Sequence, residues 1–188
     1  WVSYGDEHGT FTGVARTPTG AILVNQSHIV DGKTILDERE VVADGSWQPH
    51  RHVDDTGYDP RQRPFYKSAV AAKKRIWTDP YVFFDQGIPG ITCAKPVYGK
   101  DGALRGVVTV DFDLDRLSLF VASLHTSAHT SVFVYTDAGT ILAHPTLRVV
   151  AKSGSGAEGK LITKDDISDS IAREYFRAGA SAAFDHDG

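Results

Sequence analysis

The sequence predicts an α+β fold, in which antiparallel sheets carry a few flanking helices. Runs of β-branched and aromatic residues recur along the 188 residues, and turn residues such as glycine, proline and aspartate separate them. Only three segments have the composition or spacing of a helix. Hairpins that follow one another with few helices are typical of an antiparallel sheet with helices against it.

Composition and charge are those of an ordinary globular protein. Hydrophobic residues make up 41% of the chain, enough for a core in one domain or two small ones. The net charge of −4 is spread without long runs of one sign, so we expect no nucleic-acid partner. The single cysteine, Cys93, excludes an internal disulfide. The sequence has neither a membrane-spanning window nor an initiating methionine, and we interpret it as a piece of a larger protein.

The first half of the chain is expected to form hairpins and one helix. Residues 10–16 pair with 21–25, and 39–43 pair with 47–53 across an Asp-Gly-Ser turn. Pro64 suits a first helical turn, which predicts a short helix over 65–75. Further strands are expected at 81–84, 91–94 and 104–110.

The second half begins with an amphipathic helix. Asp113 is a plausible N-cap for residues 114–124, with Leu117, Phe120, Val121 and Leu124 on one face. A second hairpin, 131–135 with 140–144, has the same arrangement as the first. A flexible loop at 152–156 and a helix over 165–177, with Ile167, Ile171 and Tyr175 on one face, follow. The similar arrangement of the first and second hairpins predicts two copies of one sheet-based module.

The segment from Gly57 to Asp113 carries the most informative motifs. Tyr58-Asp59-Pro60-Arg61-Gln62-Arg63-Pro64-Phe65-Tyr66 is followed by Trp77-Thr78-Asp79-Pro80-Tyr81, by Gly90-Ile91-Thr92 and by Gly106-Val107-Val108-Thr109-Val110-Asp111. In order and spacing this closely resembles the Cache (PDC, PAS-like) family of bacterial sensor domains.

The resemblance implies the extracytoplasmic part of a bacterial transmembrane receptor with a kinase, chemotaxis or cyclase output. It implies a double Cache arrangement: a membrane-distal, ligand-binding module at 1–113, a connecting helix and linker at 114–130, and a partial membrane-proximal module at 131–188. The long N-terminal helix of such receptors is absent from the sequence, and the second module is expected to be truncated. We expect a small-molecule ligand, no cofactor, and a possible homodimer in the intact receptor.

The chemistry of these residues predicts a pocket with two charged poles. Arg63 and Tyr66 are three residues apart at a helix start, so we expect them to share a face and bind a carboxylate. Tyr58 can add a hydroxyl. Tyr81 and Asp111, on separate strands, can bind the positive end of a ligand. A small zwitterion or a carboxylate fits such a pocket.

The pattern also resembles the amino-acid-binding branch of the family, with two departures. Phe65 replaces a tryptophan, and Phe83 stands where an aspartate is expected, so a carboxylate that lacks the amine is a comparable candidate. Asp85 could substitute for that aspartate. The expected ligand-binding residues are Tyr58, Arg61, Arg63, Phe65, Tyr66, Trp77, Asp79, Tyr81, Phe83, Thr92 and Asp111.

Structural roles remain open for several of these residues. Arg61 or Arg63 could instead pair with Asp59, Asp79 or Asp111, and Trp77 could belong to the core. Two other functions also remain open: a dimerising module without a ligand, and a metal-dependent hydrolase built on His50 and His52, whose alternation predicts that both imidazoles lie on one face of a strand. We expect a sensor rather than an enzyme.

Overall fold

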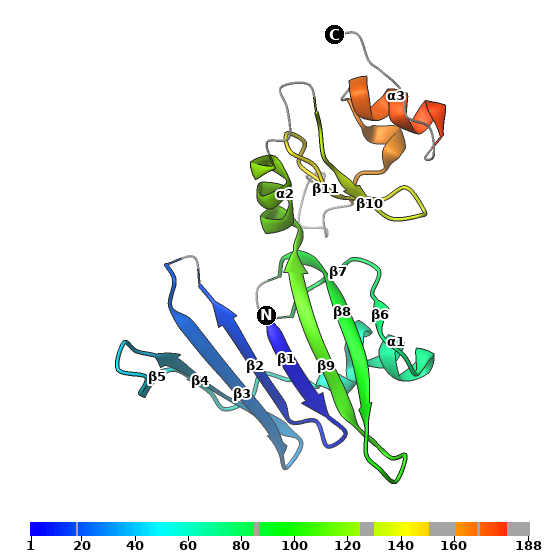
Figure 1. Cartoon of the computed structure of the whole chain (residues 1–188). Coiled ribbons are helices and arrows are strands. Elements are labelled where there is room, and N and C mark those ends of the chain that lie inside the picture. Colours follow the sequence, from blue (N-terminus) through cyan, green and yellow to red (C-terminus); the bar gives the residue numbers. More distant parts are fainter. Residues whose placement is uncertain (18, 85–86, 125–129, 151–160, 169, 180–188) are drawn as a thin grey trace. The chain divides into compact units, whose positions relative to one another are not determined.

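The computed structural model describes residues 1–17, 19–84, 87–124, 130–150, 161–168 and 170–179 (Figure 1). Two compact units make up the chain, Trp1–Phe112 and Asp113–Gly188. Within the described ranges, no helix is both long enough and apolar enough to cross a membrane. Asp85 and the expected loop at 152–156 lie outside the described residues.

The first unit is built on one antiparallel sheet of nine strands (Figure 1). Along the sheet the order is β5-β4-β3-β2-β1-β9-β8-β6, and β7 also pairs with β8. The strands are β1 Val2–Asp6, β2 Phe11–Arg16, β3 Ile22–Val30, β4 Lys33–Val41, β5 Trp47–Val53, β6 Ile76–Trp77, β7 Tyr81–Val82, β8 Pro89–Tyr98 and β9 Leu104–Asp113. The predicted antiparallel sheet is confirmed, and so are the two predicted hairpins, β2 with β3 and β4 with β5.

Strand β1 was not predicted, although it occupies the middle of the sheet. It pairs with β2 on one side and with β9 on the other, and Val2 lies opposite both Val14 and Val110. Its five residues include Gly5, which has low strand propensity. The pairing partners lie up to about a hundred residues away in the sequence, so the strand is specified by tertiary contacts more than by its own composition.

The crossing segment between β5 and β7 contains the helices of the first unit. A short 3₁₀ turn, η1 Pro60–Gln62, is followed by α1 Pro64–Ala72, which has Pro64 in its first turn as predicted. The helix ends earlier than expected because Lys73 adopts a left-handed conformation with φ of 54°. Helix α1 packs against β8 through a buried cluster of Phe65, Tyr66, Ala69, Ala94 and Val107.

The second unit contains α2 Leu114–Ser123, β10 Val134–Tyr135, β11 Ile141–Ala143, a 3₁₀ turn η2 Lys164–Asp166, and α3 Ser170–Ala178. The Asp113 cap of α2 and the β10–β11 hairpin are confirmed. The buried face of α2 was predicted only in part: Val121 is buried as expected and Leu114 is buried too, whereas Phe120 and Leu124 are exposed. The assignment of residues 131–188 to a second Cache module, after a connecting segment at 114–130, stays a prediction.

The last helix also differs from the prediction. Residues 164–166 form η2, where Thr163 and Asp166 make a reciprocal capping box. The chain is extended at Ile167, so the helix begins only at Ser170 instead of continuing from Asp165. The extended backbone interrupts the 3.6-residue repeat on which the longer helix was predicted.

Candidate functional site

A cavity of about 100 Å³ lies in the first unit between the sheet and the crossing segment. That volume is several times what a single water molecule needs, so it can hold a small organic molecule. The lining residues come from both sides: Trp1, Phe11, Asn25, Ser27, Leu36, Thr56, Tyr58, Arg63, Phe65, Tyr81, Phe83, Phe84 and Asp111.

Arg63 supplies the positive pole of the cavity. It is both the C-cap of η1 and the N-cap of α1, with an extended backbone of φ −79° and ψ 151°, the conformation that a following proline favours. Its Nη2 donates to the carbonyl oxygen of Val82 at 2.8 Å. Its Cζ lies 5.6 Å from the ring centres of both Tyr81 and Phe84. Among the described residues no carboxylate lies within 4 Å of the guanidinium, so its charge is oriented but not neutralised.

Asp111 supplies the negative pole. The Thr92 hydroxyl donates to Asp111 Oδ1 at 2.7 Å, and the Tyr81 hydroxyl lies 2.7 Å from the same Thr92 oxygen. Because Thr92 has one hydroxyl proton and gives it to the carboxylate, Tyr81 must donate to Thr92. Burial raises the pKa of Asp111, and the Thr92 hydrogen bond opposes that rise. Oδ2 of Asp111 makes no hydrogen bond to any part of the chain that the structure describes.

Aromatic rings form the walls between the two poles. Tyr58 packs on Phe11 with ring centres 5.2 Å apart and on Phe84 at 5.0 Å, and Tyr81 packs on Phe83 at 5.3 Å. Burial raises the pKa of the Tyr58 phenol, and raises that of Tyr81 to about 12. Both hydroxyls are therefore neutral near pH 7.

Six of the expected ligand-binding residues line this cavity: Tyr58, Arg63, Phe65, Tyr81, Phe83 and Asp111. Thr92 is fully buried behind them and orients Asp111. Trp77 and Asp79 lie outside the lining; Trp77 is 57% exposed and packs on Phe112, and Asp79 is exposed. Phe83 contributes a wall where the family pattern has a carboxylate.

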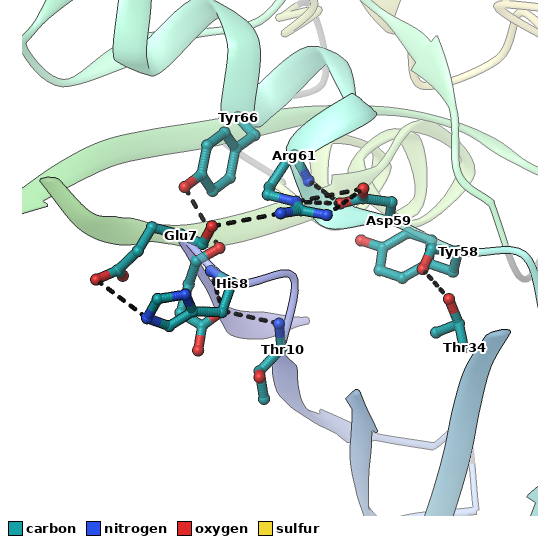
Figure 2. Close-up of polar contacts among 9 residues, drawn as sticks. Glu7, His8, Thr10, Thr34, Tyr58, Asp59, Arg61 and Tyr66 are labelled. Carbon is teal, nitrogen blue, oxygen red and sulfur yellow. Dashed lines mark hydrogen bonds and ion pairs between the residues drawn. The ribbon is translucent and has the colours of Figure 1, made fainter. Parts of the chain in front are cut away.

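Arg61 and Tyr66 also lie outside the cavity lining, and Figure 2 shows the polar contacts that hold their side chains. Arg61 forms a forked ion pair with Asp59, with its Nη2 2.8 Å from Oδ2, and reaches the Glu7 carbonyl oxygen. The Tyr66 hydroxyl donates to the carbonyl oxygen of Asp6 at 3.3 Å. The expected shared face of Arg63 and Tyr66 is wrong, because Arg63 is an extended N-cap residue and the helical i, i+3 relation does not apply to it.

Sequence reasoning missed the part of the cavity that the sheet supplies. Asn25 and Ser27 lie two apart on β3, so they share a face of the sheet, and Leu36 lies opposite Ser27 on β4. Both polar residues are buried, with 8% and 3% of their surface exposed. The available signal was a run of four polar residues, 25–28, between the apolar ends of the strand.

The histidine pair does not form a metal site. A bulge in β5 places His50 near Glu38, at 3.6 Å, and His52 on Asp37, at 2.8 Å. Asp37 and Glu38 are consecutive in β4 and point to opposite faces, so the expected common face of the imidazoles is wrong. No group of three or more metal-ligating side chains occurs within the described ranges.

The chain is similar to known proteins over part of its length. Residues 39–119 match the family of methyl-accepting chemotaxis protein-like first PDC sensor domains. The methyl-accepting chemotaxis protein PscA of Pseudomonas syringae pv. tomato is 38% identical over 96 residues, covering 51% of this chain and 15% of PscA. McpG of Pseudomonas putida is 32% identical over 144 residues, covering 74% of this chain and 22% of McpG.

A solved structure is similar over part of the chain. It is the ligand-binding domain of the Pseudomonas aeruginosa amino acid chemoreceptor PctC in complex with GABA, at 35% identity and a TM-score of 0.42, covering 56% of this chain and 46% of that one. The chain thus spans between 15% and 22% of the length of the two relatives above.

Proposed function

Because this chain carries a PDC (Cache) sensor domain of the kind found in methyl-accepting chemotaxis proteins, we propose that it senses a small molecule outside the cytoplasm for a bacterial membrane receptor. The observation that carries the proposal is the cavity of the first unit, which holds one guanidinium and one carboxylate without an ion pair between them. Both residues are partly buried, and charges that lose water without a partner are costly, so a ligand with complementary charges would stabilise both.

The ligand that fits best is a small zwitterion of the amino-acid type. Arg63 would bind its carboxylate with the donors that do not reach Val82, helped by the Tyr58 hydroxyl. Asp111 would bind its ammonium group through Oδ2, since Oδ1 is held by Thr92. Phe83 supplies no charge, and Asp111 is the one anionic residue of the lining among those that the structure describes.

Signalling would begin at the ends of the strands that hold the ligand. Asp111 lies in β9 only two residues before Asp113, the N-cap of α2. A ligand that draws the crossing segment and β9 together would favour one arrangement of this junction, and α2 would pass the change on toward a cytoplasmic output. The chain spans 15% and 22% of the length of the two relatives above, and the output domain and a homodimer of the intact receptor are part of this proposal.

The test is isothermal titration calorimetry with L-amino acids and with the matching carboxylic acids that lack the amine. Arg63→Ala should weaken amino-acid binding about 30-fold or more, because it leaves a ligand carboxylate buried without its partner. Arg61→Ala is the matched control: it removes the same side chain two residues away, outside the cavity, and should bind normally. Unchanged affinity in Arg63→Ala contradicts the proposal, and equal binding of amine-free acids contradicts the role of Asp111.

A further inference from the structure

The sheet side of the cavity carries polar groups that the two charged poles do not explain. The Ser27 hydroxyl is buried and makes no hydrogen bond with any of the described residues. The Asn25 side chain is buried beside the cavity, and its amide has no hydrogen-bond partner in the portion of the chain that the structure describes. Buried polar groups are nearly always hydrogen-bonded, so the unpaired Ser27 hydroxyl, beside the cavity-lining amide of Asn25, needs a cause.

From these groups we infer that Asn25 and Ser27 form a subsite for an uncharged, hydrogen-bonding group on the ligand's side chain. The inference rests on the proposed function and names the ligand class more closely: small polar amino acids such as asparagine or threonine. The Asn25 amide offers both a donor and an acceptor, and the Ser27 hydroxyl offers either. A ligand amide or hydroxyl can satisfy them together.

The surroundings of the two residues argue against a charged side chain. Asn25 lies opposite Glu38 in the sheet register, but Glu38 is already compensated by Arg51, whose Nε lies 3.7 Å from Oε1. Asn25 and Ser27 themselves carry no charge. A charged ligand group next to them would lose its hydration without gaining an opposite charge.

The neighbours of Ser27 also limit the length of the ligand's side chain. Ser27 lies opposite Phe11 on β2 and Leu36 on β4, and both line the cavity. These apolar groups can pack on one or two methylene groups that precede the polar end. Together with a volume of about 100 Å³, they favour a short side chain with a polar tip over a long one.

The experiment compares ligands of nearly equal shape that differ in polarity. Calorimetric titrations with asparagine against leucine, and threonine against valine, measure the preference for the polar member. In the unmodified chain the polar member should bind about tenfold tighter or more, because the apolar one leaves Asn25 and Ser27 without partners. Asn25→Leu should abolish or reverse the preference, and Ser27→Ala should reduce it severalfold.

Gln26→Leu is the matched control. Gln26 lies between the two residues but on the opposite face of β3, where its Oε1 accepts from Arg39 at 2.8 Å, so its loss should leave the preference intact. If Asn25→Leu does not fold, as judged by tryptophan fluorescence, Ser27→Ala decides the question. Preference for the apolar member in the unmodified chain, or an unchanged preference in the variants, overturns the inference.

The two proposals fail in different ways. Loss of all binding in Arg63→Ala, together with no effect of Asn25→Leu or Ser27→Ala on the preference, would reject this subsite and leave the sensor function standing. If none of the four amino acids binds the unmodified chain, the subsite and the amino-acid ligand are rejected together.

Discussion

The Thr92 hydroxyl connects the Tyr81 hydroxyl to the Asp111 carboxylate. Replacement of Thr92 by valine tests how much this hydrogen bond stabilises the charged form of Asp111. The Thr92 hydroxyl donates to Asp111 at 2.7 Å and accepts from Tyr81 at the same distance, and its side chain is fully buried. Thr92→Val keeps the shape but removes one hydrogen bond to a charged group and one to a neutral group. Such bonds contribute about 1.5–3 and 0.5–1.5 kcal/mol, so we expect the first unit to lose about 2–4 kcal/mol of its free energy of unfolding.

The loss can be measured on the first unit alone. All the tryptophans, Trp1, Trp47 and Trp77, lie within Trp1–Phe112, so tryptophan fluorescence during urea denaturation reports on that unit. Thr92→Ser is the control, since it keeps the hydroxyl and should cost only about 1 kcal/mol for the missing methyl group. The valine variant should therefore be clearly less stable than the serine variant.

The pH dependence makes the test sharper. The hydrogen bond from Thr92 favours the ionised form of Asp111 and opposes the rise of its pKa by burial. Its contribution is therefore present where Asp111 is ionised and decreases as the pH falls through the raised pKa of Asp111. The Thr92→Val penalty should be largest near pH 7 and shrink in acid. A valine variant as stable as the serine variant at pH 7 would refute the reasoning.

Two further changes probe the cavity itself. Because burial raises the pKa of Asp111, the affinity for L-asparagine should fall as the pH decreases from 7 toward about 4. Asp111→Asn should bind L-asparagine at least tenfold more weakly at pH 7, and its affinity should not depend on pH in this way. The same pH dependence in both proteins would contradict the role of the carboxylate. Gly90→Ala would place a Cβ against the Phe83 ring and 2.7 Å from the Phe112 carbonyl oxygen, so the ring and the neighbouring strand must shift. This should cost about 1–3 kcal/mol of stability by urea denaturation and weaken binding; wild-type values for both would contradict a fixed packing of Phe83 on Gly90.

Local sequence signals were sufficient for much of the fold of the first unit. Turn sequences placed the β2–β3 and β4–β5 hairpins, and Pro64 placed the start of α1. The signals failed where a partner far along the chain decides the structure. Strand β1 is held by β9, and the buried face of α2 is set by what it packs against, not by where its apolar residues recur.

The candidate site divides in the same way. Arg63 and Asp111 could be predicted to line one cavity because their chemistry and motif spacing are local features. The direction of Tyr66 could not be, because its hydroxyl is held by the Asp6 carbonyl at the end of the unpredicted β1. Asn25 and Ser27 could not be assigned either, since the alternation of β3 gives two faces and only the crossing segment decides which of them faces the cavity.

Arg61 and Arg63 differ in what holds their guanidinium groups, and this difference bears on ligand binding in the cavity. Arg61 is neutralised by the Asp59 carboxylate and thereby fixes the loop. Arg63, two residues later, is held by the Val82 carbonyl, and Asp111 is held by the Thr92 hydroxyl. A carbonyl and a hydroxyl orient a charged group but leave its charge uncompensated. Each pole is therefore fixed in place before binding, so a zwitterionic ligand gains both electrostatic contacts without the cost of ordering these side chains.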